Sequence, residues 1–299
     1  MFGSSSGLDV LLQRRRASKW EEFIKEPRIF LASQLYKWRR IVPFEPIKPI
    51  TVVCISDTHN SQPVDIPAGE ILIHAGDITQ GGTWKEIQAS IDWLKSLPHP
   101  NKVVIAGNHD ILLDPNQRHF DGAASASIIW GDIRYLESES TVIICANGRH
   151  LKIYGSPLTP RYGNWVFQYL RHRNVWYSKI PEDTDILITH GPPKGHLDAG
   201  HLGCKHLLDE LWRTKPRLHV FGHVHDGHGT EWIQFDGLQR AYENVVEAGG
   251  GQLGLARAVY ELLVSYLTPM KESRALLVNA SIVGGLQDKL SRRPVVVRV

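Results

Sequence analysis

The sequence predicts a layered α/β domain, because short apolar runs typical of buried strands alternate with segments of helical periodicity. Five of these runs are rich in Val, Ile and Leu, and each is followed by a polar turn that carries His, Asp or Asn. Ligands of open α/β sheets bind beyond the carboxyl ends of the strands. The five turns are therefore expected to meet at one site.

The expected elements follow one another along the chain. Strands are expected at residues 51–55, 71–73, 103–106, 186–189 and 218–221, with a last strand at 295–297. Thr83 and Glu86 have the spacing of a capping box, in which the two residues exchange hydrogen bonds at a helix start. Ile87, Ile91 and Leu94 then share one face, which predicts an amphipathic helix after Thr83.

We expect the domain to occupy residues 50–299, after an N-terminal helical extension at 1–49, with a helical insertion at about 231–272. In the extension, Pro27 suits a first helical position, and Leu31, Leu35 and Trp38 recur at helical spacing before a basic end. We favour packing of this helix on its own domain over docking to a membrane surface or a partner. Packing against the main domain is likewise expected for the insertion.

Composition and charge restrict the class of protein. Lys and Arg total 34 against 31 for Asp and Glu, which gives a net charge of +3, so nucleic-acid binding is not expected. No run of about 18 apolar residues occurs, so no transmembrane segment is expected. Three cysteines are too few for a disulfide framework, which favours a cytoplasmic location. A mitochondrial presequence and a peripheral membrane contact through the N-terminal helix are the alternatives.

The strand-end turns together offer seven side chains that can bind a metal ion. They are Asp57, His59, Asp77, Asn108, His190, His223 and His225. Oxygen and imidazole donors without thiolates suit Mn, Fe or Zn. Seven donors are too many for one tetrahedral ion and suit two divalent ions that share a bridging carboxylate. Two such ions carry a charge of +4 and two aspartates return −2, so the centre would attract a phosphate ester. Any one of these residues alone is more often a turn cap than a ligand.

The same turns resemble the five signature blocks of the calcineurin-like metallophosphoesterase superfamily. The blocks are Asp57-x-His59, Gly76-Asp77, Gly107-Asn108-His109-Asp110, His190-Gly191 and Gly222-His223-x-His225. The sequence around these blocks is most similar to the metallophosphoesterase domain-containing subfamily, which has phosphodiesterase activity. The similar segments include Thr189-His190-Gly191-Pro192-Pro193 and Val278-Asn279-Ala280-Ser281. The resemblance implies a four-layer αββα sandwich of two mixed β-sheets flanked by helices.

Carried over by position, the resemblance also implies roles for these residues. Asp57, His59 and His225 would bind the first ion, Asn108, His190 and His223 the second, and Asp77 would bridge the two. His109 would remain free of metal, stabilise the phosphoryl charge and protonate the leaving alkoxide. Asp110 would either orient the His109 ring or cap the next turn.

The substrate side departs from two branches of the superfamily. The protein Ser/Thr phosphatases would carry an Arg after the second block, and the purple acid phosphatases a Tyr where Gln80 stands; this sequence has neither. Residues 155–165 resemble the subfamily's corresponding loop, and Arg161 and Trp165 are candidates for substrate binding.

The expected activity is hydrolysis of small phosphodiesters, such as cyclic nucleotides, or of phosphomonoesters, by attack of a metal-bound hydroxide. The alternatives are a metal-containing protein that binds a nucleotide with little turnover, and a phosphoprotein phosphatase. The sequence does not indicate an oligomeric state.

Overall fold

The computed structural model describes residues 18–39, 41, 46–117, 127–200, 202–248, 251–267, 273–284 and 289–299. The chain divides into two compact units. The larger unit comprises Ile41–Phe235, Glu272–Gly284 and Asp288–Val299, and the smaller comprises Met1–Arg40, Asp236–Lys271 and Gly285–Gln287. The expected metal ligands all belong to the larger unit.

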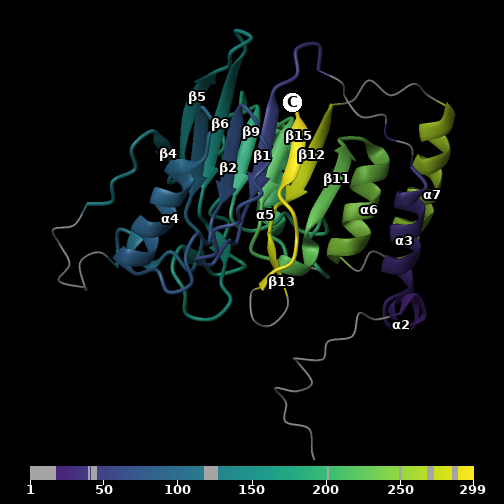
Figure 1. Ribbon diagram of the computed structural model, residues 1–299. Helices are drawn as coiled ribbons and strands as arrows, with labels where there is room; N and C mark the ends of the chain where they lie inside the picture. Colours follow the sequence, from purple (N-terminus) through teal and green to yellow (C-terminus); the bar gives the residue numbers. More distant parts are fainter. Residues whose placement is uncertain are drawn as a thin grey trace, which may run out of the picture. The chain divides into compact units, whose positions relative to one another are not determined.

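The first sheet of the larger unit has the strand order β15-β1-β2-β3-β4 (Figure 1). Its strands are β1 (Thr51–Ile55), β2 (Ile71–Ala75), β3 (Asn101–Ile105), β4 (Ile133–Tyr135) and β15 (Val295–Arg298). β1 to β4 are parallel, whereas β15 runs antiparallel to β1. Ile55 pairs with His74 and Ala75 with Ile105, so the first three strands end at the same edge.

The second sheet has the strand order β11-β12-β10-β9-β6-β5. Its strands are β5 (Glu139–Ile144), β6 (His150–Ser156), β9 (Ile186–Thr189), β10 (Leu218–Phe221), β11 (Gly229–Gln234) and β12 (Arg274–Asn279). The four inner strands are parallel, and the two edge strands are antiparallel to their neighbours. Val220 pairs with Ile188 and Phe221 with Asn279, so these strands also end together.

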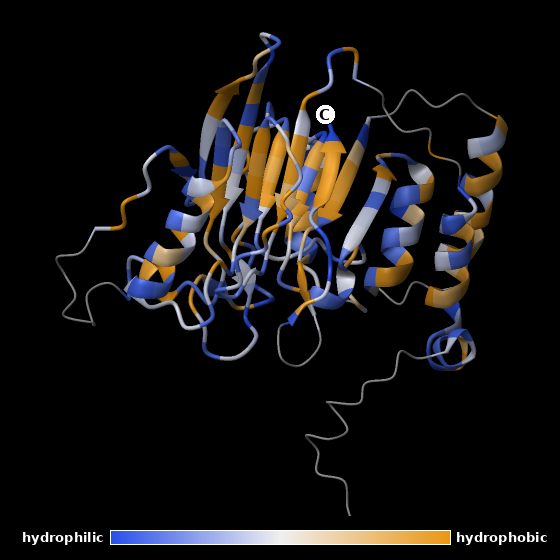
Figure 2. Cartoon of the chain, in the orientation of Figure 1, coloured by the Kyte–Doolittle hydropathy of each residue, from blue (hydrophilic) through white to orange (hydrophobic). Residues whose placement is uncertain are grey.

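The two sheets pack face to face over a shared apolar core. Side chains of β1 to β3 such as Ile73 meet side chains of the second sheet such as Ile188 and Val220 in one buried cluster. On the outer faces, α4 (Trp84–Ser96) covers the first sheet and α5 (Lys205–Thr214) the second. In Figure 2 the central strands of the two sheets are mainly orange, as expected for strands buried on both sides. The predicted four-layer arrangement is confirmed.

α4 begins where the sequence predicts. The Thr83 hydroxyl accepts a hydrogen bond from the Glu86 amide, and the Glu86 carboxylate accepts one from the Thr83 amide. Ile87, Ile91 and Leu94 are fully buried against the first sheet. The capping box and the apolar face together explain this helix.

Two short pairs of strands complete the larger unit. β7 (Thr159–Pro160) pairs with β8 (Gln168–Tyr169), and β13 (Val283–Gly284) with β14 (Lys289–Leu290). Short 3-10 helices follow β3 and β10, at Ile111–Leu113 and His225–Gly227. β7 and β8 frame the loop that carries Arg161 and Trp165.

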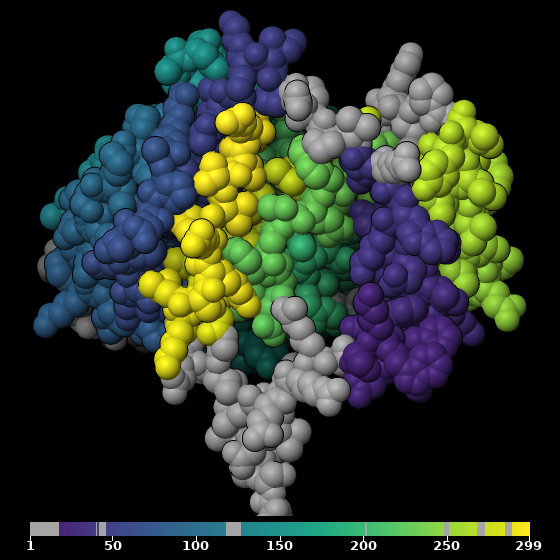
Figure 3. Space-filling model, turned by 45° about the vertical axis from the view of Figure 1, so that its right-hand side comes forward, coloured from purple at the N-terminus to yellow at the C-terminus, as the bar shows by residue number. Residues whose placement is uncertain are grey.

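The smaller unit is helical. It contains α2 (Lys19–Lys25), α3 (Pro27–Lys37), α6 (Gly237–Ala248) and α7 (Gln252–Leu267). Leu35 of α3 packs on a buried cluster from α6 and α7, whereas Leu31 and Trp38 are exposed. Figure 3 shows α3 in purple beside α7 in yellow-green. In the described part of the chain, no helix has both the length and the apolar character needed to cross a membrane.

The helical insertion begins later than the sequence predicts. Residues 231–234 form part of β11 and pair with β12, so they belong to the second sheet. The helices start only at Gly237. Residues 249–250 and 268–272 of the expected insertion lie outside the described residues, as do residues 1–17, 40 and 42–45 of the expected N-terminal extension.

Candidate metal centre

The structure brings the seven expected ligands together at the carboxyl ends of five strands. Asp57 and His59 follow β1, Asp77 follows β2, Asn108 follows β3, His190 follows β9, and His223 and His225 follow β10. Three groups of their carboxylate oxygens and imidazole nitrogens, one of which includes His109, each lie within 4.8 Å of one another. Five of these eight side chains are buried, and the other three, His109, His223 and His225, are partly exposed.

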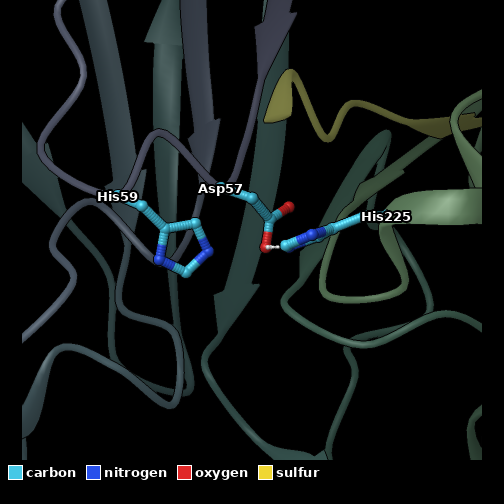
Figure 4. A group of neighbouring side chains, drawn as sticks. All are labelled: Asp57, His59 and His225. Carbon is cyan, nitrogen blue, oxygen red and sulfur yellow. Dashed lines mark ion pairs between the residues drawn. The ribbon is translucent and has the colours of Figure 1, made fainter. Parts of the chain in front are cut away.

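The first group is formed by Asp57, His59 and His225 (Figure 4). His225 Nε2 lies 3.5 Å from Asp57 Oδ1. Both ring nitrogens of His59 are buried, and neither has a hydrogen-bond partner among the described residues. Burying an imidazole whose nitrogens have no hydrogen-bond partner costs free energy. The surroundings of His59 therefore indicate that this side chain binds a ligand.

The second group is formed by Asp77, His190 and His223. His190 Nδ1 donates to the Ala75 carbonyl over 2.9 Å, which fixes the proton on that nitrogen. His190 Nε2 therefore faces Asp77 Oδ2 at 3.2 Å and Asn108 Oδ1 at 3.1 Å. When His190 Nε2 is deprotonated, these are three electron-rich atoms around one point, an arrangement that a cation stabilises.

Asp77 joins the two groups. Its Oδ2 atom lies 3.9 Å from His59 Nε2 and 3.2 Å from His190 Nε2. Asp77 also belongs to a third group with His59 and His109. Its carboxylate therefore has the position of a bridge between two ions.

The backbone at these turns is strained. Asp57, His59, Asp77 and His223 have φ angles of +54°, +43°, +50° and +65°, in the left-handed region that residues other than glycine rarely adopt. Such conformations cost of order 1–3 kcal/mol each and concentrate at functional sites. This strain could not be predicted from the sequence, because the residues concerned are not glycines.

Two glycines next to the ligands are required for close packing. A Cβ atom on Gly222 would lie 2.1 Å from Asp57 Oδ2, and one on Gly107 would lie 2.2 Å from Asp77 Oδ1. From sequence alone these glycines indicate only tight turns. In the structure they let the backbone approach the two carboxylates.

The titration properties of the centre reflect burial and mutual charge. Burial alone would raise the pKa of the Asp57 carboxyl, but His225, His190 and His59 hold this pKa well below its usual range. Burial lowers the pKa of His190, but the Asp77 and Asp57 carboxylates more than offset this and raise it to about 9. Burial, and then the charge of His190, lower the pKa of His223 to about 4. Positive charge is thus favoured between the two carboxylates.

His109 is held at the rim of the centre. Its Nδ1 donates to the Gln80 carbonyl over 2.8 Å, so Nε2 is the nitrogen left for a substrate. Its ring stacks on Trp165 with 4.0 Å between centroids and meets the His59 ring edge-on at 4.8 Å. The neighbouring Val166 and Phe167 are buried in the core of the first sheet and anchor Trp165 there.

Asp110 caps the turns of the centre. Its carboxylate accepts hydrogen bonds from the amides of Ile78, Thr79 and Gly107 and from the Thr79 hydroxyl. Burial and the charge of Asp77 raise the pKa of Asp110 to about 6. Because the His109 ring bonds to Gln80 instead, the geometry favours the cap over orientation of that ring.

The two residues expected to bind substrate, Trp165 and Arg161, have different surroundings. Trp165 contacts His109 and is 40% exposed. The Arg161 guanidinium donates within its own loop, to the Gly163 carbonyl at 3.3 Å and to Asn164 Oδ1 at 2.9 Å. Sequence reasoning did not assign a role to Gln80, Asn279 or Ser281, although the last two lie in a quoted motif.

The residues present fit two divalent ions. The centre offers carboxylate, amide and imidazole donors without thiolates, the set that suits Mn, Fe or Zn. The buried His59 nitrogens without a partner and the facing acceptors around His190 Nε2 are both explained by bound cations. The identity of the metal does not follow from these donors.

Comparison with known proteins agrees with this geometry. The model of the calcineurin-like phosphoesterase family matches residues 50–227, which contain all seven expected ligands. This match confirms the resemblance found in the five sequence blocks.

Individual relatives cover the chain to different extents. Probable rhamnogalacturonate lyase C of Emericella nidulans is 42% identical over 299 residues, which are 98% of this chain and 29% of that protein. Metallophosphoesterase domain-containing protein 1 of Homo sapiens is 38% identical over 219 residues, 63% of this chain and 65% of that protein. UPF0046 protein C25E10.12 of Caenorhabditis elegans is 32% identical over 242 residues, 70% of this chain and 80% of that protein.

The chain therefore spans less than a third of the length of the first relative and just under two thirds of that of the second. The family match covers more than half of this chain and includes the whole candidate centre. The chain belongs to the calcineurin-like phosphoesterase family.

Proposed function

We propose that this protein is a metal-dependent phosphoric ester hydrolase that cleaves small phosphodiesters at the centre described above. Asp57, His59 and His225 would hold one divalent ion, and Asn108, His190 and His223 would hold the other. Asp77 would serve both ions. When bound, the ions supply positive charge that stabilises a phosphoryl group and activates water at neutral pH.

The position of Asp77 is the observation that carries this proposal. Its Oδ2 atom lies 3.9 Å from one candidate histidine, His59, and 3.2 Å from the other, His190. A carboxylate in this position can serve both groups of donors. Its other oxygen, Oδ1, accepts a hydrogen bond from the His109 amide over 2.8 Å, which leaves Oδ2 facing the imidazole nitrogens.

His109 acts on the leaving group. Its Nδ1 proton is bound to the Gln80 carbonyl, so Nε2 is the atom that can take up a proton and pass it to a departing alkoxide. The Trp165 ring beside it restricts the orientation of the imidazole. Asp110 maintains the turns that carry Asp77 and His109 through its four hydrogen bonds.

Small phosphodiesters, with cyclic nucleotides among them, are favoured over phosphoproteins as substrates. The sequence after Asp77 lacks the Arg with which protein phosphatases bind phosphate, and Gln80 stands where purple acid phosphatases have a Tyr. The exposed part of the Trp165 ring offers a surface on which a base can stack. All three cysteines are free and buried, which fits the reducing cytoplasm that we propose as the location.

The test is turnover of bis-p-nitrophenyl phosphate and of p-nitrophenyl phosphate with Mn²⁺, each with and without a chelator. We expect chelation to abolish turnover and the diester to be cleaved faster than the monoester. Asp77→Asn should abolish both activity and metal binding.

Asp114→Asn is the matched control for that variant. Asp114 is also buried, but its carboxylate accepts from Asn116 in the next turn and contacts none of the expected ligands. This variant should retain metal and activity. Equal rates with and without chelator would contradict the proposal. Tight binding of a nucleoside monophosphate without hydrolysis of any ester would support the alternative of a nucleotide-binding protein.

A further inference from the structure

The segment after β12 connects the two sheets at the edge where the centre lies. The Ala280 amide donates to the Phe221 carbonyl of the second sheet over 2.7 Å. Ser281 then forms a bridge with Ser56, next to β1 of the first sheet, and the Ile282 amide donates to the Ser56 carbonyl over 3.0 Å. The chain thus crosses from the second sheet to the first next to Ser56 and Asp57.

Asn279 has a fixed orientation in this crossing. Its Nδ2 donates to the carbonyls of Val224 at 2.8 Å and Leu197 at 3.1 Å. Because carbonyls only accept hydrogen bonds, the amide cannot be flipped, and Oδ1 must face Ser281. There Oδ1 accepts from the Ser281 amide at 3.2 Å and lies 2.9 Å from the Ser281 hydroxyl oxygen. Val224 stands between His223 and His225, so Asn279 also fixes the turn that carries both histidines.

The Ser281 hydroxyl has one proton and two acceptors within reach. Asp57 Oδ2 lies 2.7 Å away and Asn279 Oδ1 lies 2.9 Å away. The shorter bond to a charged carboxylate is the stronger one, so the hydroxyl donates to Asp57. Ser281, Asn279 and Asp57 are all fully buried, and water does not compete for this proton.

This bond makes the two oxygens of Asp57 unequal. The Ser281 hydroxyl engages Oδ2, while Oδ1 faces His225 Nε2 at 3.5 Å. The His223 amide lies 3.1 Å from both oxygens and does not discriminate between them. Among the hydrogen bonds to Asp57 from the described residues, that of the Ser281 hydroxyl therefore sets which oxygen is presented to His59 and His225.

We propose that Ser281 is a positioning residue for the first ion, that is, for the group formed by Asp57, His59 and His225. Ser281 orients the Asp57 carboxylate. Asn279 holds Ser281, and through Val224 it also holds the turn of His223 and His225, which serves both ions. This inference rests on the proposed function, because it assumes that the centre binds two ions. Outer hydrogen-bond partners of metal ligands typically contribute 10–100-fold to metal affinity.

The role of Ser281 is specific to one ion, and this specificity can be tested. Among the described residues, the Ser281 hydroxyl lies within hydrogen-bond distance of Asp57 and Asn279 and of none of Asn108, His190 and Asp77. Ser281→Ala should weaken the binding of one ion by about 10–100-fold and leave the other within about threefold.

The measurement is calorimetric titration of the metal-free full chain with Mn²⁺ and with Zn²⁺, with two binding events expected for the wild type. Asp57→Asn identifies the event that belongs to the first ion. If Ser281 acts through Asp57, the double variant Asp57→Asn/Ser281→Ala should bind no more weakly than Asp57→Asn alone.

Ser156→Ala is the matched control. Ser156 also ends a strand of the second sheet and is fully buried, but its hydroxyl lies 2.9 Å from that of Ser138. The Ser156→Ala variant should bind both ions with wild-type affinity. If Ser281→Ala does not fold, as judged by circular dichroism, Ser281→Cys keeps a similar shape with a weaker donor and should give an intermediate loss for the first ion.

Wild-type affinity for both ions in Ser281→Ala would overturn the inference and leave the proposed function intact. An equal loss for both ions would also overturn it, because it would indicate a general structural role. A wild-type protein that binds no metal ion would overturn the proposed function and the inference with it.

Discussion

His109 is held by two contacts that leave one nitrogen for chemistry. The Nδ1 proton is bound by the Gln80 carbonyl, and the ring face is covered by Trp165. His109→Asn should lower the rate by about 10²–10⁴-fold for diesters with alkoxide leaving groups, which need a proton. The loss should be small for p-nitrophenolate, which departs without one. Steady-state rates across a series of leaving groups check this, and equal losses for all of them would contradict the assignment.

Trp165 acts on His109 through ring stacking. Its backbone is anchored by the buried Val166 and Phe167, so Trp165→Leu should free the His109 ring without moving the loop. We expect kcat to fall by about 10-fold, since loss of alignment alone costs up to about 10²-fold. KM should be nearly unchanged for bis-p-nitrophenyl phosphate, which carries no base to stack on the exposed part of the ring. Tyr162→Leu, at an exposed position of the same loop, is the control. An unchanged kcat would contradict a role of Trp165 through His109.

His219 on β10 makes folding stability depend on pH. Burial lowers its pKa from the usual value of 6.5 to about 3, and its Nε2 lies 2.8 Å from the Thr189 hydroxyl oxygen. Between these two pH values the unfolded chain binds a proton that the folded chain does not, so stability falls as the pH falls. From pH 6.5 to 5.5 this residue should remove about 1 kcal/mol. In urea unfolding, the free energy of unfolding of His219→Gln should lack that part of the pH dependence. If the wild type and the variant depended on pH in the same way, the role of His219 would be contradicted.

At the scale of elements, the strand ends were the most predictable feature. Val, Ile and Leu runs identify β1, β2, β3, β9 and β10, because a strand buried on both faces must be apolar throughout. β11 was missed because residues 231–234, Glu-Trp-Ile-Gln, lack such a run and form an edge strand. The left-handed backbone at Asp57 and Asp77 could not be predicted either, since tertiary contacts impose it against local preference.

The start of α4 depends on its capping box. The Thr83 hydroxyl accepts from the Glu86 amide, and the Glu86 carboxylate also accepts from the Gly81 amide and the Asn60 side chain. Thr83→Ala should lower the free energy of unfolding by about 1 kcal/mol. Lys85→Ala, at an exposed position of the same helix, should change it by less than about 0.5 kcal/mol. Equal values for the two variants in chemical denaturation would mean that the cap does not stabilise the helix.

At the scale of the whole larger unit, the sequence predicted that the turns converge but not how. The five motifs point to one site because parallel strands end at a common edge. The pairing of the strands into two sheets depends on contacts distant in sequence, such as the bridge between Ser56 and Ser281. No local sequence pattern specifies such a contact, so the bridge between Ser56 and Ser281 could not be predicted from the sequence.

The candidate centre joins both sheets, so bound ions should stabilise the larger unit as a whole. Asp57 and Asp77 follow strands of the first sheet, whereas His190 and His225 follow strands of the second. Unfolding separates these donors, and an ion present at 100 times its Kd then stabilises the folded state by about 2.7 kcal/mol. For a unit of this size, that corresponds to a rise in Tm of about 5–10 °C per ion. Differential scanning calorimetry with Mn²⁺ and with a chelator measures the difference. Asp77→Asn should abolish it while Asp114→Asn retains it, and a wild-type Tm that is unaffected by chelation would mean that the two sheets are not linked through metal.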